Sequence, residues 1–85
     1  MLRPLDIKVS LEDEIEKCIE EDSEFIAGVL KEDKENVIEE FWDSVQTKLN
    51  VMDIMGISMK EINEGLHKHL DKMTRRGYTF KTEGR

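Results

Sequence analysis

The 85-residue sequence has little of what defines several protein classes. Its single cysteine, Cys18, cannot form a disulfide within one chain, so a reducing cytoplasm is the expected location. It has one proline, Pro4, and it contains no low-complexity linker and no internal repeat. No apolar run is long enough for a signal peptide or a membrane span, so we expect no membrane partner.

Positive charge is also scarce. The chain has 13 basic and 20 acidic residues, a net charge of -7 at pH 7. This argues against a general affinity for nucleic acid, which needs a positive face. An acidic chain binds a polyphosphate only if divalent cations lie between the two. A core made by 85 residues alone is marginal, so we expect self-association as a dimer or tetramer.

Apolar residues at helical spacing predict three helices, over about 11–31, 34–55 and 58–77. The first two begin after the N-cap residues Ser10 and Asp33, and the third opens with a capping box, Ser58-Met59-Lys60-Glu61. Gly56 is expected to end the second helix.

Short loops between amphipathic helices favour antiparallel neighbours, and three helices of this length cover one another only partly. The prediction is therefore an all-α fold in which three amphipathic helices form a helical bundle completed by dimerisation. The expected organisation is an N-terminal extension at 1–9, a helical domain at 10–77 and a short tail at 78–85.

Two pairs of carboxylates stand at i, i+3 spacing, Glu21 with Glu24 and Glu40 with Asp43. Residues at this spacing share a helix face, with Cβ atoms about 5–6 Å apart. If the helices pack antiparallel, the four carboxylates meet near mid-helix, where such oxygen clusters suit Mg²⁺ or Mn²⁺. The alternative is solvated helix surface, since i, i+3 carboxylate pairs are common by chance in a chain with 20 acidic residues.

Two further polar residues occupy notable positions. Asn50 continues the stripe of Glu40 and Asp43 on the second helix, where it is either a substrate ligand or an exposed polar residue. Asp22 falls near the centre of the first helix's apolar face. It is expected to line a polar cavity or to meet a basic group at a subunit interface.

Read as one pattern, these residues resemble the MazG-like nucleotide pyrophosphohydrolases. That family's recurrent motif stands here as Glu20-Glu21-x-x-Glu24, fifteen residues, then Glu40-x-x-Asp43. The Gly-Ile turn at 55–58 and the basic last helix at 61–77 also resemble the family, and the similarity covers roughly residues 11–80. Two features differ: Ser23 replaces a frequent glycine, and about nine residues stand where many members have a helix that helps to form the nucleoside pocket.

The resemblance implies a hydrolase that converts a nucleoside triphosphate to its monophosphate and pyrophosphate. Carried over by position, Glu21, Glu24, Glu40 and Asp43 would bind Mg²⁺, with Mn²⁺ as the alternative ion. Glu20 would be the catalytic base. Residues expected to contact substrate are Asn50 and three cations of the last helix, Lys68, Lys72 and Arg75.

Two other functions stay open at this point. One is a non-catalytic acidic helical dimer that binds a protein and derives from the same fold. The other is an acidic mimic of nucleic acid, which fits the charge but leaves the positions of the carboxylates unexplained.

Overall fold

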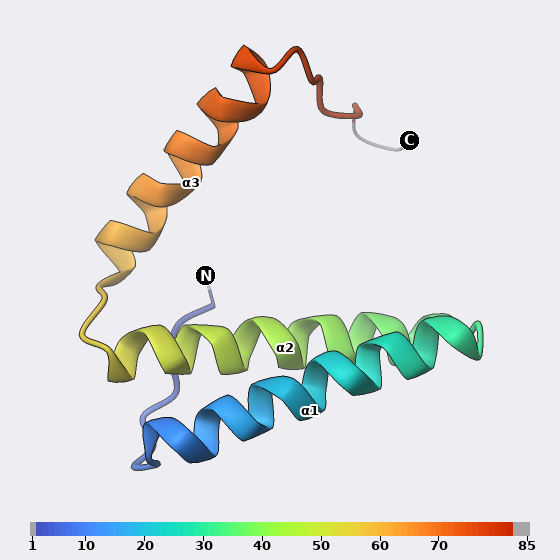
Figure 1. Cartoon of the computed structure of the whole chain (residues 1–85), viewed down its shortest axis with the longest axis vertical. Coiled ribbons are helices and arrows are strands. Elements are labelled where there is room, and N and C mark those ends of the chain that lie inside the picture. Colours follow the sequence, from blue (N-terminus) through green and yellow to red (C-terminus); the bar gives the residue numbers. More distant parts are fainter. Residues whose placement is uncertain (1, 83–85) are drawn as a thin grey trace.

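The computed structural model describes residues 2–82, which contain three helices and no strand. These are α1 (Leu11–Leu30), α2 (Lys34–Ile54) and α3 (Met59–Arg75), as Figure 1 shows. The predicted all-α class is confirmed, and the predicted helix ends agree to within one or two residues. Met1 of the predicted extension and residues 83–85 of the predicted tail lie outside the described residues.

Side chains cap the start of each helix as predicted. The Ser10 hydroxyl accepts a hydrogen bond from the backbone N–H of Asp13 at 3.1 Å, and Asp33 accepts one from Asn36 at 3.2 Å. At α3, Ser58 and Glu61 form a complete capping box. These bonds satisfy backbone donors that have no partner inside the helix, which is why local sequence fixes the helix starts.

The three helices end in the same way, with the two backbone hydrogen bonds of a Schellman motif. At the end of α2, Ile57 N donates to Met52 O and Gly56 N donates to Asp53 O, each at 2.9 Å. This cap places a residue with positive φ just past each helix. Glycine takes that place after α2 and α3, but Glu32 takes it after α1, with φ of 55°.

We predict that Glu32→Gly stabilises the chain by about 1 kcal/mol, because the left-handed conformation is unfavourable for a residue with a Cβ. Urea unfolding followed by circular dichroism measures this difference. Glu32→Ala is the control, since it removes the charge but keeps the Cβ. An equal gain from both variants would show that charge, not backbone conformation, is responsible.

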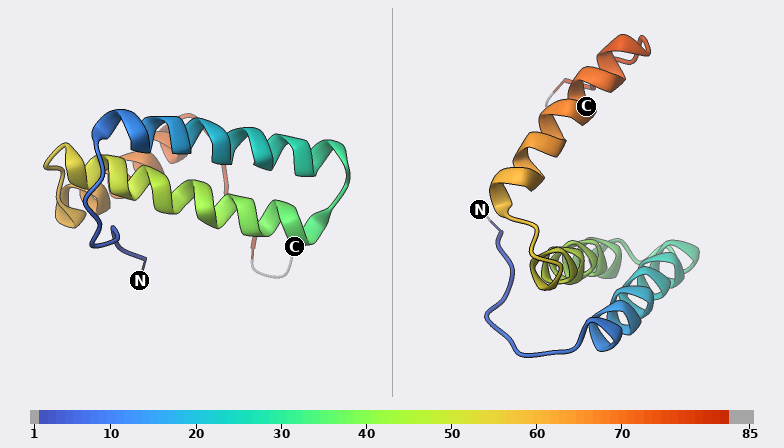
Figure 2. Two further views of the ribbon diagram at one scale, coloured as in Figure 1. Left: turned by 90° about the horizontal axis from the view of Figure 1, so that it is seen from below. Right: turned by 60° about the vertical axis from the view of Figure 1, so that its left-hand side comes forward.

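Helices α1 and α2 lie antiparallel and form a hairpin (Figure 2, left). The buried residues of this contact are mostly polar or small: Glu14, Glu21, Gly28, Glu40, Ser44, Thr47 and Asn50. The larger apolar residues of the two helices lie largely outside it, with Ile19 61% and Ile38 62% exposed. Among the described residues, Leu49 is the only buried hydrophobic residue.

Helix α3 projects away from the hairpin (Figure 2, right). No Cα atom of α3 lies within 8 Å of one in α1 or α2. The segment before α1 is extended and crosses α2, held by hydrogen bonds from Leu5 N to Asn50 Oδ1 and from Gln46 Nε2 to Arg3 O. A single chain is thus a hairpin of α1 and α2, with residues 2–10, which we call the strap, on one side of it. Helix α3 forms an arm, and the three helices do not pack together within residues 2–82.

Across residues 2–82, none of the helices combines the length and the apolar character that a bilayer crossing requires.

Candidate metal centre

Three carboxylates of the predicted set converge where α1 and α2 pack. One oxygen each from Glu21, Glu24 and Glu40 lies within 4.8 Å of the other two. The i, i+3 spacing within α1 and the antiparallel packing of α2 bring them together, as the sequence predicted for these residues. The fourth predicted ligand, Asp43, is not part of this group. It follows Glu40 by one helical turn and is exposed.

The helix faces explain why carboxylates become buried here. Glu14, Glu21 and Gly28 are spaced seven residues apart, so they form one stripe on α1 that faces α2. Across from them, Glu40, Ser44 and Thr47 form the matching stripe on α2. At Gly28 a Cβ would lie 3.1 Å from the Val37 side chain, so the helices approach closely near the turn. Close packing of this stripe removes Glu21 and Glu40 from water.

The cluster lacks the hydrogen bonds that buried carboxylates normally have. Glu21 and Glu40 are each only 9% exposed. The Oε2 atom of each is buried without a hydrogen-bond partner. The neighbouring Glu21 carboxyl, then burial and the nearby Glu24, raise the pKa of Glu40 to about 7. At neutral pH the cluster therefore holds a proton or needs a cation.

A cavity of about 250 Å³ lies beside the cluster. Glu21 belongs to both, and Asp43 lines the cavity from α2. The N-terminal strap supplies two apolar walls, Leu5 and Ile7, and α1 supplies the cation Lys17. The cavity is slightly smaller than the roughly 300–1,000 Å³ typical of ligand pockets, so it suits a small ligand or part of a larger one.

Asn50 holds the strap against the hairpin. Its Nδ2 donates to Glu14 Oε2 at 2.9 Å, and its Oδ1 accepts from Leu5 N at 2.9 Å. Asn50 is 4% exposed and also lines the cavity. It is therefore not the exposed polar residue considered from sequence, and its amide is already engaged by the chain itself.

We predict that Asn50→Ala destabilises the chain by about 1–3 kcal/mol, because it leaves the buried Glu14 carboxylate without its donor. Chemical denaturation gives this difference. Gln46→Ala is the matched control: Gln46 Nε2 donates to Arg3 O at 2.8 Å and to Asn50 Oδ1 at 3.2 Å, but its loss leaves no buried carboxylate without a donor, so it should cost less than about 1 kcal/mol. Equal losses for the two variants would contradict a special role for Asn50.

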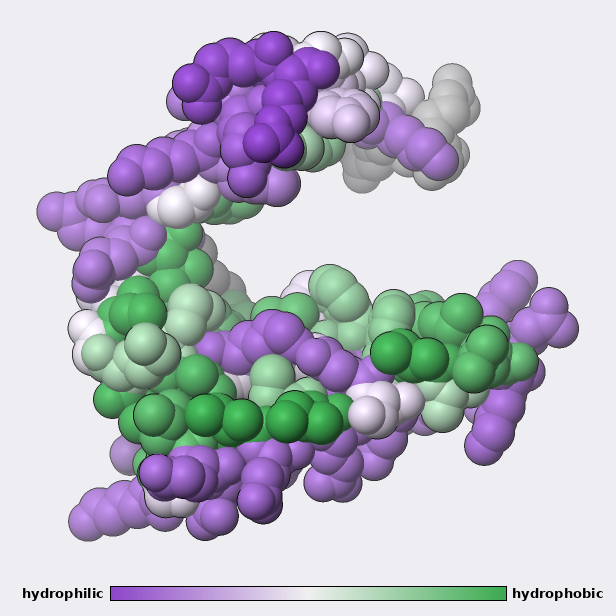
Figure 3. Space-filling model, in the orientation of Figure 1, coloured by the Kyte–Doolittle hydropathy of each residue, from purple (hydrophilic) through white to green (hydrophobic). Residues whose placement is uncertain are grey.

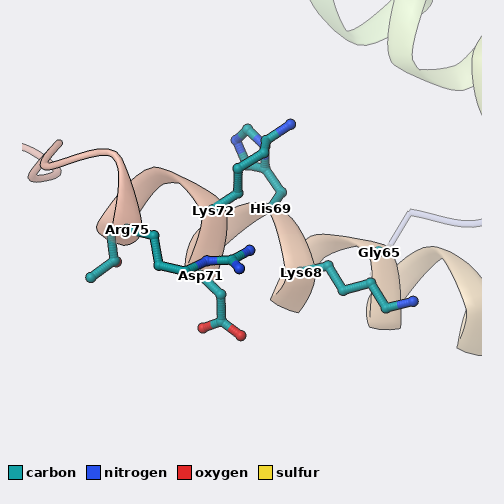
Figure 4. A pocket seen from close by; sticks show the side chains of 7 residues that line it. Gly65, Lys68, His69, Asp71, Lys72 and Arg75 are labelled. Carbon is teal, nitrogen blue, oxygen red and sulfur yellow. The ribbon is translucent and has the colours of Figure 1, made fainter.

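The remaining predicted site residues lie apart from the cluster. Glu20 is exposed and is not one of the three converging carboxylates. Lys68, Lys72 and Arg75 line a hollow along α3, together with Gly65, His69, Asp71 and Thr74 (Figure 4). Within one chain, no Cα atom of α3 lies within 8 Å of one in α1 or α2, and these cations do not line the cavity beside the acidic site.

Sequence reasoning missed two residues of this region. Glu14 is 3% exposed and bonds to Asn50, and Lys17 lines the cavity. The available signal was the seven-residue spacing of Glu14 and Glu21, which places them on one helix face.

Asp22 meets a basic group within its own chain. Its Oδ1 lies 2.8 Å from Lys48 Nζ and accepts a hydrogen bond from Ser44 Oγ at 2.5 Å. These contacts, with Lys48 first, hold the pKa of Asp22 below its ordinary value. Asp22 therefore forms an ion pair with Lys48 on the hairpin and is not part of the acidic cluster.

Comparisons with protein-family models, with curated proteins and with solved structures found no match to this chain.

Proposed function

We propose that this chain is a Mg²⁺-dependent nucleoside triphosphate pyrophosphohydrolase of the MazG-like type. It would break the anhydride between the α and β phosphates and release pyrophosphate and a nucleoside monophosphate. The observation that supports this most is the convergence of Glu21, Glu24 and Glu40 around buried carboxylate oxygens that lack partners.

The cluster fits a divalent cation. Mg²⁺ and Mn²⁺ prefer carboxylate oxygens, and two such oxygens here have no other partner. Burying like charges together is unfavourable unless a cation compensates them. When bound, the ion would neutralise the triphosphate and lower the pKa of water. Glu21, Glu24 and Glu40 would hold it, with Asp43 as a fourth ligand from the next turn of α2.

The cavity beside the cluster gives the substrate a place. We propose that the nucleoside lies against Leu5 and Ile7, and that Lys17 faces the phosphates. Asn50, whose Oδ1 positions the strap, would hold this wall, and the Nδ2 hydrogen that is not donated to Glu14 would contact the sugar or a phosphate. The extended strap thus forms one wall of the proposed nucleoside site.

Glu20 remains the proposed general base. It is exposed and adjacent in sequence to the proposed ligand Glu21, so it can approach the reacting water without itself binding the cation. As a carboxylate near cations, it acts through its position.

The proposed contacts of Lys68, Lys72 and Arg75 with phosphate require a second copy of the chain. In one chain α3 lies apart from the hairpin, so its cations reach a triphosphate only across a subunit contact. We therefore propose that the active form is a homodimer or a tetramer, acting on the cytoplasmic nucleotide pool.

The direct test is pyrophosphate release from a panel of standard and modified nucleoside triphosphates, with Mg²⁺ and with EDTA. Pyrophosphate and monophosphate should appear in equal amounts with at least one substrate and only with the cation. Release of orthophosphate instead, or no turnover of any triphosphate, would refute the proposal.

A second candidate is a non-catalytic helical dimer that binds a protein partner. The exposed apolar residues of the hairpin favour it, since large exposed apolar patches mark interaction surfaces. It predicts no turnover and no rise in melting temperature with Mg²⁺.

A further inference from the structure

The single chain leaves far more surface exposed than a compact protein of its size. It exposes 7220 Å², about 2,000 Å² more than expected for a compact 10.0 kDa monomer. Its radius of gyration is 15.2 Å, against about 12 Å for a compact domain of this length. Two surfaces contribute to this exposure, one on the hairpin and one on α3.

The hairpin surface is an apolar face to which both helices contribute. A groove of about 400 Å³ crosses it, lined by Ile15, Cys18, Ile19, Lys48, Val51 and Met52. Ile26, Val29, Ile38 and Phe41 extend the apolar surface toward the turn, and each is 46% exposed or more. Figure 3 shows hydrophobic atoms gathered along the hairpin and an open hollow between it and α3. We call this surface the hairpin face.

The charged groups at this groove already neutralise each other. Lys48 Nζ lies 2.8 Å from Asp22 Oδ1 and 2.6 Å from Ser44 Oγ. Burying an ion pair costs far less free energy than burying an unpaired charge. The hairpin face can therefore be buried without stranding this ion pair.

The second surface is the apolar stripe of α3. Its members recur at helical spacing along one side: Met59, Ile62, Leu66, Leu70 and Met73. Leu66 is 52% and Leu70 36% exposed. A free amphipathic helix of 17 residues gains most of its stability from a surface that covers its apolar side. The hairpin of the same chain does not supply that surface in this structure.

Charge favours the pairing of these two surfaces. Residues 11–54, which form the hairpin, carry 15 acidic and four basic side chains, a net -11. Residues 59–82, which include α3, carry three acidic and six basic side chains, a net +3. Two hairpins packed face to face would repel each other, whereas α3 against a hairpin is electrostatically complementary.

We propose that α3 of each copy docks by its apolar stripe into the hairpin face of a second copy, so that two chains exchange arms in a closed dimer. Both copies present the same pair of surfaces, which a two-fold axis satisfies reciprocally. If each chain lost its excess exposure, the interface would bury about 4,000 Å², within the range of obligate homodimers. This inference deepens the proposed self-association and does not depend on the proposed hydrolysis.

Analytical ultracentrifugation of the full chain tests the proposal with two double variants. Leu66→Glu with Leu70→Glu alters the stripe, and Ile19→Glu with Ile26→Glu alters the hairpin face. The wild type should be a dimer, and each variant should raise the dissociation constant at least about 100-fold, since it removes two buried aliphatic side chains. Glu64→Gln, on the side of α3 away from the stripe and exposed, is the control and should stay dimeric.

Mixing the two double variants separates arm exchange from other dimers. One chain then has an intact arm and the other an intact hairpin face, so the mixture should dimerise at concentrations where each variant alone is monomeric. A monomeric wild type would overturn the proposal. So would an arm variant that stays dimeric while the hairpin variant dissociates, because the hairpins would then pack on each other. A dimer without turnover would instead count against the hydrolysis alone.

Discussion

Glu24→Gln, Glu40→Gln and Asp43→Asn are each expected to lower kcat/KM for Mg²⁺-dependent pyrophosphate release at least about 1,000-fold. A cation at a phosphate contributes several kcal/mol to transition-state stabilisation, and each 1.4 kcal/mol is about tenfold in rate. Replacing a carboxylate by its amide keeps the size of the side chain and removes the charge that holds the ion. The assay is steady-state pyrophosphate release at saturating Mg²⁺.

Glu39→Gln is the matched control, because Glu39 precedes Glu40 on α2 but is exposed and outside the cluster. It should leave kcat/KM within about twofold of wild type, as surface substitutions generally do little. Comparable losses from Glu39→Gln and Glu40→Gln would show that overall charge, not the cluster, matters. Full activity of Asp43→Asn would restrict the ligand set to the three converging carboxylates.

Glu20→Gln should behave differently from the ligand variants. A general base contributes about 10²–10⁴-fold to the rate. Loss of kcat on that scale with unchanged cation affinity, measured by calorimetry, is the expected result. If cation affinity falls instead, Glu20 acts as a ligand and not as the base.

The second large effect concerns pH and stability. In the cation-free chain, the Glu40 carboxyl has a pKa raised from 4.5 to about 7 by Glu21, burial and Glu24. A raised folded-state pKa gives stability that is fully present below about pH 4.5 and is lost as pH rises through about 7. The melting temperature of the cation-free wild type should therefore fall between pH 5 and pH 8.

Other shifted carboxyls act outside this window. Hydrogen bonds from Lys48 to Asp22, and from the Ser58 backbone and hydroxyl to Glu61, lower the pKa of each acceptor. Their stabilisation is present above the unfolded pKa values of 3.8 and 4.5 and is lost only as pH falls below them. The fall in melting temperature above pH 5 is therefore attributed to the acidic cluster of Glu21, Glu24 and Glu40.

Glu40→Gln isolates this effect. The variant cannot ionise at position 40, so its melting temperature should fall less between pH 5 and pH 8 and should exceed that of the wild type at pH 8 without a cation. Mg²⁺ should raise the melting temperature of the wild type more at pH 8 than at pH 6, since the cation competes with the proton, and should not raise that of Glu40→Gln. If the melting temperatures of wild type and Glu40→Gln fell equally between pH 5 and pH 8, ionisation of Glu40 would not be the cause of the fall.

Local sequence predicted the helices well because their ends depend on local chemistry. Ser10, Asp33 and Ser58 satisfy backbone donors within three residues, and Gly56 adopts the positive φ that ends α2. The convergence of Glu21, Glu24 and Glu40 followed from i, i+3 spacing and antiparallel packing. These are short-range rules, so they need no knowledge of the rest of the fold.

The orientation of the two helices about their axes was not predictable in this way. The hairpin packs through Glu14, Ser44 and Thr47, whereas apolar residues such as Ile19 and Ile38 are exposed, which helical spacing of apolar residues does not indicate. Small and polar side chains let α1 and α2 approach each other closely, and the larger apolar side chains stay exposed on the hairpin. The position of α3 was not predictable either, because no Cα atom of α3 lies within 8 Å of one in α1 or α2.

We propose that Glu21, Glu24 and Glu40 form a divalent-cation site that serves a nucleotide. The most direct measurement is a crystal structure with Mn²⁺ and a non-hydrolysable nucleoside triphosphate, with the ion located by its anomalous signal. We expect Mn²⁺ in contact with carboxylate oxygens of all three residues and with the triphosphate, and the nucleoside beside Leu5 and Ile7. A nucleotide bound elsewhere, with no ion at the three carboxylates, would contradict the proposed cation site.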